Sequence, residues 1–165
     1  MDSSRERLNQ AQALWDEYGP IVARSLIAYE RDLERRKDLL QDVFLGVFES
    51  VNRITAAKTP RAYVLRIAHN IAADHIAREA KRGWVSLDDE PACSVSDPAA
   101  LATRLDENQR LIEAVRKLPM AYRQVTVLLL EDLKPAEIAE ALGLKPGAVR
   151  VRLTRARSML KEALK

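Results

Sequence analysis

The C-terminal third of the chain carries two short helical patterns separated by a tight turn, and this feature most constrains the fold. The patterns lie within residues 131–161, and the turn at 143–145 begins with a glycine. Glycine just past a helix end adopts the left-handed conformation without a steric penalty. Pro135 and Pro146 stand where the first helical turn leaves an N–H without a partner. The segment therefore predicts a helix-turn-helix, a motif that docks on DNA.

The second helix of this motif has one apolar face and one polar, basic face. At the helical period, six apolar side chains fall together: Val149, Leu153, Ala156, Leu160, Ala163 and Leu164. The other side carries Val151, Thr154, Arg155 and Ser158, with Arg150 and Arg157 on one shoulder and Arg152 on the other. We expect Arg150 and Arg155 to reach a groove. A merely solvated basic face is the alternative, and the shaped turn before it favours DNA.

Composition indicates an all-α protein of one domain or two small ones. The 165 residues are 47% hydrophobic and 31% charged, and the five glycines and two phenylalanines argue against a β-sandwich or barrel. No apolar run approaches the ~20 residues that span a bilayer, and the N-terminus has no signal-peptide core. Cys93 is the only cysteine. We therefore expect no disulfide, no membrane insertion of its own and a reducing, cytoplasmic location.

Charge alternates along the chain in blocks. Residues 1–57 carry 8 basic and 10 acidic side chains, a balance of −2, and residues 58–82 carry 6 and 2, a balance of +4. Residues 83–118 carry 4 and 7, a balance of −3, and residues 119–165 carry 9 and 5, a balance of +4. Two separate basic segments predict two contacts with a polyanion, and the acidic surfaces are left for protein partners.

The first 52 residues predict two short helices broken at Gly19-Pro20 and a stronger helix over 34–52. The stronger helix has a continuous apolar stripe. Its other face carries Asp38, Gln41, Asp42, Leu45 and Glu49. An acidic face repels phosphate and so is not a DNA surface. Either it is plain solvated surface, or it is a docking face for a basic protein partner.

Residues 53–58 read as a loop, after which Thr59 caps a long helix that begins at Pro60. Its inward face is predicted to hold Val64, Leu65, Ile67, Ala68, Ile71, Ala72 and His75. Its outward face is predicted to hold Arg66, His69, Asn70, Ala73 and Ala77, with Tyr63 at the border. Asparagine can read base edges. The two histidines lie about 120° apart around the helix, so they do not share a metal, and His75 is interpreted as a core histidine.

Residues 83–104 lack helical periodicity and contain glycine, prolines and serines, so they predict a flexible linker between helical domains 1–82 and 105–165. The second domain is expected to begin its core with Leu105, Leu111, Ile112, Val115 and Leu118. A following helix over 120–131 is expected to support the helix-turn-helix through Val125, Val127, Leu128, Leu129 and Leu130.

Both halves together resemble bacterial RNA polymerase sigma factors of the extracytoplasmic-function class. In the first half, Asp38-Leu-Leu-Gln-Asp-Val-Phe44 is similar to the family's polymerase-binding helix, and Thr59-Pro-Arg-Ala-Tyr-Val-Leu-Arg-Ile-Ala-His-Asn70 to its −10 element reader. In the second, Leu118-Pro119, Arg123, 136–143 and 149–157 resemble its −35 reader. The order and spacing of these segments match the family over nearly the whole chain apart from the linker.

The resemblance implies roles for individual residues. Polymerase-core binding falls to Asp38, Gln41, Asp42 and Leu45. Contact with the −10 element falls to Tyr63, Arg66, His69 and Asn70, and residues 53–58 match the loop that captures a flipped base. Contact with the −35 element falls to Arg150, Val151, Arg152, Thr154, Arg155 and Arg157. Arg152 and Arg157 either touch phosphates or pair with Glu137 or Glu140.

The same resemblance implies RNA polymerase core, through its clamp and flap regions, and duplex and melted promoter DNA as partners, and an anti-sigma protein as inhibitor. It implies no catalysis, no cofactor and no metal. Some positions depart from the family pattern: Lys134 and Lys145 replace helix-capping serines, Val151 replaces a small polar residue, and Tyr63 replaces a tryptophan. Alternatives of another kind are a stand-alone helix-turn-helix regulator and a decoy that sequesters an anti-sigma protein.

Overall fold

The computed structural model describes residues 2–82 and 99–165, and the side chains of these residues except 99–103. Within this part of the chain the fold is all-α and contains no strand, as predicted. The helices are α1 (Asp2–Leu26), α2 (Leu33–Glu49), α3 (Val51–Ala56), α4 (Pro60–Lys81), α5 (Ala99–Arg116), α6 (Met120–Leu130), α7 (Pro135–Leu142) and α8 (Pro146–Ala163).

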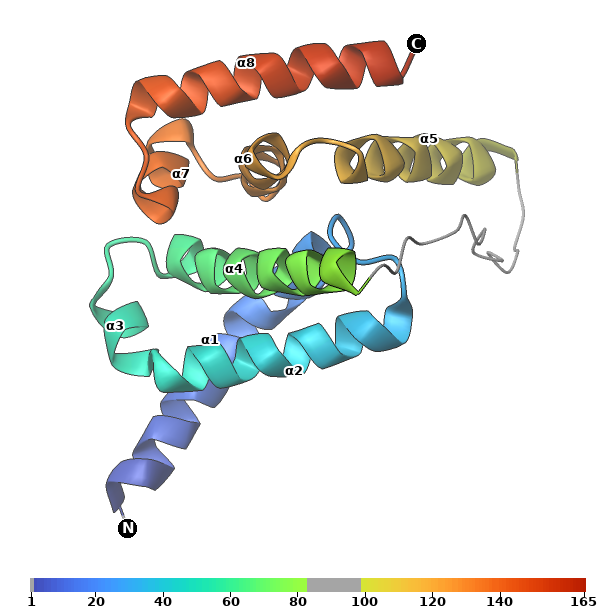
Figure 1. Ribbon diagram of the computed structural model, residues 1–165. Coiled ribbons are helices and arrows are strands. Elements are labelled where there is room, and N and C mark those ends of the chain that lie inside the picture. The colour runs from blue at the N-terminus through green and yellow to red at the C-terminus, as the bar shows by residue number, and fades with distance from the viewer. Residues whose placement is uncertain (1, 83–98) are drawn as a thin grey trace.

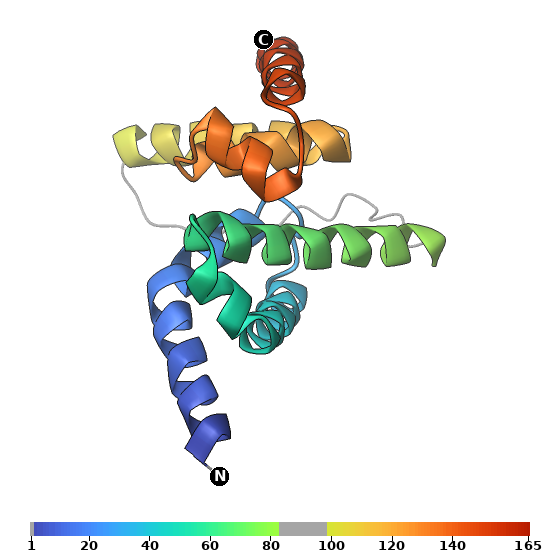
Figure 2. The same cartoon turned by 90° about the vertical axis from the view of Figure 1, so that its left-hand side faces the viewer.

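The helices stack in layers, with α1 to α4 forming a first half and α5 to α8 a second half. In Figures 1 and 2, α5, α6 and α7 lie across α4, and α8 lies on the side of that layer that faces away from α4. The two ends of the chain lie at opposite extremes of the molecule (Figure 1). Helix α4 packs on α1 and α2 on one side and on α6 and α7 on the other, so it is the element that joins the halves.

Helix α1 is continuous, so the predicted break at Gly19-Pro20 is wrong. Proline inside a helix removes one hydrogen bond and costs about 3 kcal/mol. Tertiary packing on both sides offsets that loss. The ring of Trp15 lies over Gly19, and Val22 and Leu26 beyond the proline are fully buried. A break would have separated these contacts.

Helix α2 confirms the strong helix predicted at 34–52, although it ends at Glu49. Its N-cap is Asp32, whose carboxylate accepts the backbone N–H of Arg35 at 2.8 Å. The helix approaches α4 closely, because a Cβ at Gly46 would lie 2.8 Å from Cγ2 of Ile67. The loop predicted at 53–58 is wrong in its first part, where the short helix α3 holds Val51 and Ile54 in the core.

Helix α5 begins at Ala99, so the predicted linker extends six residues too far into it. The run Ala99-Ala-Leu-Ala102 consists of strong helix formers. The rest of the predicted linker, 83–98 with Cys93, lies outside the described residues. Two predicted core residues of the second half are largely exposed, Leu105 at 51% and Leu130 at 55%.

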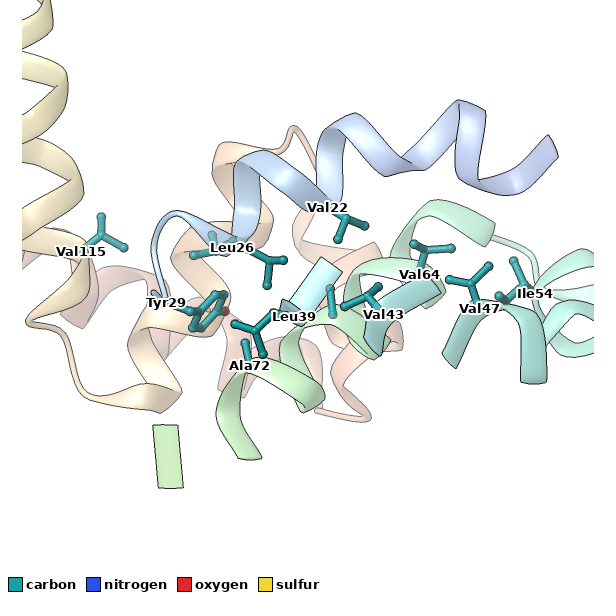
Figure 3. Close-up of a cluster of buried hydrophobic side chains, with 12 residues drawn as sticks. Val22, Leu26, Tyr29, Leu39, Val43, Val47, Ile54, Val64, Ala72 and Val115 are labelled. Carbon is teal, nitrogen blue, oxygen red and sulfur yellow. The ribbon is translucent and has the colours of Figure 1, made fainter. Parts of the chain in front are cut away.

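Two buried clusters form the core, and both take side chains from both halves. The first combines Val22, Leu26, Val43 and other residues of α1, α2 and α4 with Val115 of α5 and Val127 of α6 (Figure 3). The second surrounds the helix-turn-helix and combines its core with two residues of α4, which are Ala62 and Leu65. Leu65 was predicted to face inward, and it packs against the second half of the molecule. Val127 was predicted to support the helix-turn-helix, and it packs instead in the cluster formed mainly by the first half.

Candidate nucleic-acid and protein interfaces

Helices α7 and α8 form the predicted helix-turn-helix. Gly143 has φ +63°, in the left-handed region, and nothing lies within 4 Å of a Cβ built on it. Its N–H donates to the carbonyl of Glu140 at 3.3 Å, and the next N–H, of Leu144, donates to the carbonyl of Ala139 at 2.9 Å. This pair of bonds closes the end of α7 in a Schellman motif. At the start of α7, the Glu137 carboxylate accepts the backbone N–H of Lys134 at 3.1 Å.

Asp132 was not singled out in the sequence and also adopts the left-handed conformation, with φ +63°. The bonds around it repeat the pattern of the α7 end, with Asp132 N–H donating to Leu129 and Leu133 N–H to Leu128. Aspartate is one of the few non-glycine residues that adopts this conformation readily. The turn before the helix-turn-helix therefore has the same left-handed residue and the same pair of backbone hydrogen bonds as the turn inside it.

Helix α8 buries one face and exposes the other, as the helical pattern predicts. Val149, Leu153 and Ala156 are buried, and Leu160 is half-buried. The predicted packed face ends there, because Ala163 and Leu164 are exposed. The predicted DNA-contacting residues fall into two groups: Arg150, Val151, Thr154, Arg155 and Arg157 are exposed, and Arg152 is half-buried.

The α8 arginines are available to a ligand. Within the described part of the chain, neither Arg152 nor Arg157 pairs with Glu137 or Glu140, so that alternative is wrong. The hydroxyl of Thr154 donates to the carbonyl of Arg150 at 2.9 Å, which directs one polar side chain back along the helix.

Helix α4 exposes only part of the predicted −10 face. Arg66 and Asn70 are exposed and Tyr63 is half-buried. His69 was predicted to face outward and is 7% exposed, so its placement as a freely accessible DNA contact is wrong in this arrangement. A helical wheel cannot tell which side chains from another helix will cover a given angle. His75 was interpreted as a core histidine and is only half-buried. Its ring does have a partner, since Nε2 lies 2.6 Å from a carboxylate oxygen of Glu30.

His69 lies in a small polar cluster at the junction of the halves. Its Nδ1 is 2.8 Å from the hydroxyl of Tyr29, and the guanidinium carbon of Arg123 lies 6.0 Å from the centre of the Tyr29 ring. Burial first, and the charge of Arg123 second, lower the pKa of His69 to about 4. Burial raises the pKa of Tyr29. At neutral pH the imidazole is neutral, and we assign the bond as Tyr29 O–H donating to Nδ1.

The acidic face of α2 is exposed as a unit. Asp38, Gln41, Asp42 and Leu45 follow one another at helical spacing and all lie at the surface. Leu45 is 56% exposed, an isolated apolar side chain among polar ones. Asp42 also borders a hollow between α2 and α4, whose lining includes Asp74. The sequence reasoning did not single out Asp74, because its role as a neighbour of Asp42 depends on how the two helices pack.

Ion pairs and hydrogen bonds join the two halves around α4, and the sequence predicted none of them. Arg24 pairs with the carboxylate of Glu131 at 3.1 Å, and Arg61 donates to the backbone carbonyl of the same residue. Arg31 pairs with Glu113. These partners are 70 to 107 residues apart in sequence, so no local pattern could have related them.

An apolar groove of about 220 Å³ follows this junction. Its lining comes from the end of α1 and the next residues, from α5 and from α6, and includes Ile27, Ala28, Leu111, Ile112 and Leu130. In the described residues no helix is long and apolar enough to cross a membrane. The same residues contain no group of three or more His, Cys, Asp or Glu side chains that could hold a metal ion.

Comparison with protein families identifies both halves of the chain. The model described as Sigma-70 region 2 matches residues 14–82, and the model described as Sigma-70, region 4 matches residues 108–160. The chain belongs to the sigma-70 family. The first match contains the exposed faces of α2 and α4, and the second contains the helix-turn-helix. The resemblance drawn from the sequence is therefore confirmed, and the chain has a role in transcription initiation by RNA polymerase.

Relatives place this sigma factor in the extracytoplasmic-function class. It is similar to the RNA polymerase sigma factor HrpL of Pseudomonas syringae pv. syringae, with 30% identity over 77% of this chain and 72% of that protein. It is similar to the ECF sigma factor SigW of Bacillus subtilis (strain 168), with 26% identity over 81% of this chain and 78% of that protein. A further match is the probable sigma factor RfaY of Xanthomonas campestris pv. campestris, with 26% identity over 84% of this chain. The matched region is 36% of the length of RfaY.

Solved structures share the fold of this sigma factor over nearly its whole length. One is CnrH in complex with the cytosolic domain of CnrY, with TM-score 0.66 and 22% identity over 98% of this chain and 96% of that one. Another is the sigma factor RpoE of Bartonella quintana in complex with the anti-sigma factor NepR, with TM-score 0.68 and 18% identity over 99% and 96%.

Proposed function

We propose that the chain is a promoter-specificity subunit that binds RNA polymerase core, reads the −35 and −10 elements and helps to melt the −10 region. The observation that carries the proposal is the placement of three exposed faces within the matched sigma regions. The acidic face of α2 and the Arg66–Asn70 face of α4 lie within region 2, and the arginine-rich face of α8 lies within region 4. The subunit performs no covalent catalysis and needs no cofactor.

Reading of the −35 element falls to α8. A recognition helix places side chains from its exposed face in the major groove, where arginine pairs with guanine through two hydrogen bonds. Arg150 and Arg155 are exposed on that face and are the proposed base readers. Arg152 and Arg157 lie nearer its edges and are proposed to contact phosphates. Val151 and Thr154 complete the contact, and the methyl groups of Val151 suit a thymine methyl.

Reading of the −10 element falls to α4 and to residues 53–58. Arg66 and Asn70 are exposed one helical turn apart, and Tyr63 is at the edge of the same face. Residues 53–58, which include the end of α3, are proposed to hold a flipped base. Flipping a base costs a few kcal/mol, so the free subunit is expected to bind promoter DNA weakly. Polymerase core supplies the remaining contacts that hold the opened promoter.

Polymerase docking falls to the α2 face. Asp38 and Asp42 provide charge for a basic partner surface, and Leu45 provides an apolar contact beside them. Complementary charge speeds and orients association more than it adds affinity. The proposed partner surface is the polymerase clamp, with the helix-turn-helix half meeting the flap. This places the subunit in the cytoplasm, with the nucleoid when it is part of the holoenzyme.

An anti-sigma protein is the proposed inhibitor, and the apolar groove at the junction of the halves is its proposed docking site. The groove is lined by both halves, so an apolar helix seated there would hold them together. The two solved relatives of similar shape carry a partner, the cytosolic domain of CnrY in one and the anti-sigma factor NepR in the other. Recovery of polymerase subunits alone in a pull-down would count against this part of the proposal.

Run-off transcription tests the function. Purified core polymerase is given a pool of genomic promoter fragments with and without the chain, and the transcript starts are sequenced. We expect selective initiation only when the chain is present. Absence of stimulation on every fragment would reject the proposal. If the chain without polymerase bound specific duplex DNA with high affinity, the result would instead favour a stand-alone helix-turn-helix regulator.

A further inference from the structure

Helix α8 presents one apolar side chain in the middle of its proposed DNA-facing side. Val151 is 49% exposed and lies around the helix between Arg150 and Arg155, which are both exposed. The helix is on the outer side of its layer, facing away from α4 (Figure 1). Valine forms helices less readily than alanine, so helix propensity does not favour it at an exposed position. A single exposed valine is ordinary surface, and the neighbours of Val151 are what give it a role.

Thr154 is one of these neighbours, because residues three apart lie side by side on a helix surface. Its hydroxyl donates to the carbonyl of Arg150 at 2.9 Å, so its single O–H hydrogen is used within the helix. The side chain can still accept a hydrogen bond, but it has none to donate, and its other branch is a methyl group. Val151 and Thr154 therefore offer methyl groups and no donor to a ligand.

A surface of this kind selects one chemical group in the major groove of DNA. Thymine alone carries an apolar group on that edge, the C5-methyl, whereas the other bases present only hydrogen-bond donors and acceptors. An apolar side chain against a donor or acceptor removes its water without replacing the hydrogen bond, which is unfavourable. The Val151–Thr154 surface therefore favours a thymine.

Arg155 determines which base accompanies this thymine. It makes no ion pair in the described part of the chain, so its guanidinium can pair with O6 and N7 of a guanine. It follows Val151 by about one helical turn, a rise of about 6 Å. Base pairs are stacked about 3.4 Å apart. The two side chains therefore reach base pairs that are adjacent or separated by one other.

We propose that Val151, beside the methyl group of Thr154, reads the C5-methyl of a thymine that lies roughly one or two base pairs from the guanine bound by Arg155. The inference rests on the proposed function and deepens it, since it names the chemical group that α8 recognises in the −35 element. The methyl group itself is the ligand. The site therefore discriminates against uracil, and it gains affinity when a cytosine at that position carries a C5-methyl.

Base analogues that change only the methyl group test the proposal. Holoenzyme is assembled from core polymerase and the full chain, and its affinity is measured for a promoter mapped in the transcription experiment. Each −35 thymine is replaced in turn by uracil, which keeps the hydrogen-bonding groups of thymine and lacks the methyl. One replacement should weaken binding about fourfold, which corresponds to about 0.8 kcal/mol for one methyl group. With a cytosine–guanine pair at the same position, 5-methylcytosine should bind about fourfold more tightly than cytosine.

The variant Val151→Ala tests which side chain reads the methyl group. It removes two methyl groups from an exposed position and improves helix propensity, so the chain should fold, which circular dichroism checks. The penalty for uracil should fall below about twofold, because the apolar contact is lost. Met159→Ala is the matched control, since it also shortens an exposed apolar side chain of α8. It should keep the full penalty.

Loss of the uracil penalty in Val151→Ala and its retention in Met159→Ala would support the proposal. An equal penalty in the wild type and in Val151→Ala would overturn the assignment to Val151, and no penalty at any −35 thymine would overturn the methyl readout. The base position whose selectivity is relaxed by Arg155→Ala must lie within about two base pairs of that thymine, and a more distant position would reject the spacing. Failure of the proposed function would be seen separately, since no promoter would then be mapped in the transcription experiment.

Discussion

The hydroxyl of Tyr29 lies 2.8 Å from Nδ1 of His69, where the first half of the molecule meets the second. The bond requires a neutral imidazole, and burial beside Arg123 keeps the ring neutral by lowering the pKa of His69 to about 4 from an ordinary value of 6.5. Between these two values the unfolded chain binds a proton that the folded chain does not. Stability is therefore fully present above pH 6.5 and is lost as the pH falls towards 4.

The first prediction is that His69→Gln flattens this pH dependence. Glutamine can accept the Tyr29 hydroxyl proton and does not titrate. A depression of 2.5 pKa units (6.5 − 4) corresponds to about 3 kcal/mol between the two pH limits. Urea unfolding at pH 7 and pH 4.5 should show a larger loss in the wild type than in the variant. Equal losses in the two proteins would contradict the assignment of His69 as the group responsible.

The second prediction separates two glycines of the helix-turn-helix. Gly143→Ala should lower the free energy of unfolding by about 1–2 kcal/mol, since alanine is strained in the left-handed conformation. Gly147→Ala, in the first turn of α8, should raise it by about 0.5–1 kcal/mol. An added Cβ has open space at both positions, so backbone conformation alone distinguishes them. Urea unfolding with an unchanged m-value checks both, and the idea fails if the two variants change in the same direction.

The third prediction concerns the proposed −35 reader. Arg155→Ala should weaken binding by about 1–3 kcal/mol at one base position and relax selectivity there. Lys161→Ala removes an exposed charge further along the same helix and serves as control. The selectivity is measured with holoenzyme, in competition between promoters that differ at a single position of the −35 element. A uniform loss over all sequences would assign Arg155 to a phosphate instead.

The fourth prediction concerns polymerase docking. Asp42→Lys reverses a charge at the centre of the α2 face and should weaken binding to core polymerase roughly tenfold, since like charges would then face each other. Glu34→Lys makes the same change nearer the start of the helix, at a position that pairs with Lys37. Titration of labelled variants with core polymerase checks the difference. Equal affinities for the two variants would remove Asp42 from the interface.

Some residues were placed correctly because their signals are local. Gly143 and the prolines that begin α7 and α8 are turn and helix-start residues whose effect extends over a few neighbours. The exposed set on α2 follows from helical period alone, since the opposite side of that helix is apolar. Recognition of the two sigma regions depends on the order of such local patterns, and the family comparisons confirm it.

Other placements failed because distant side chains decided them. Gly19 and Pro20 favour a break, and packing of Trp15, Val22 and Leu26 keeps α1 continuous. The helical period places His69 on the outward face of α4, but Tyr29 and Arg123 cover it in the folded chain. Leu105 is apolar and was expected in the core, but no helix in the described part of the chain covers it, and it is 51% exposed.

The amino-acid sequence by itself determined most of the helices, which of their faces are apolar and which carry arginine or acid, because hydrophobic period and cap residues act within a few turns. Only the tertiary structure decided that Leu65 and Val127 belong to cores shared between the halves, and that Glu131 joins Arg24 and Arg61. Such contacts are selected by shape and charge between surfaces far apart in the chain. A helical period specifies that a face is buried and does not specify its partner.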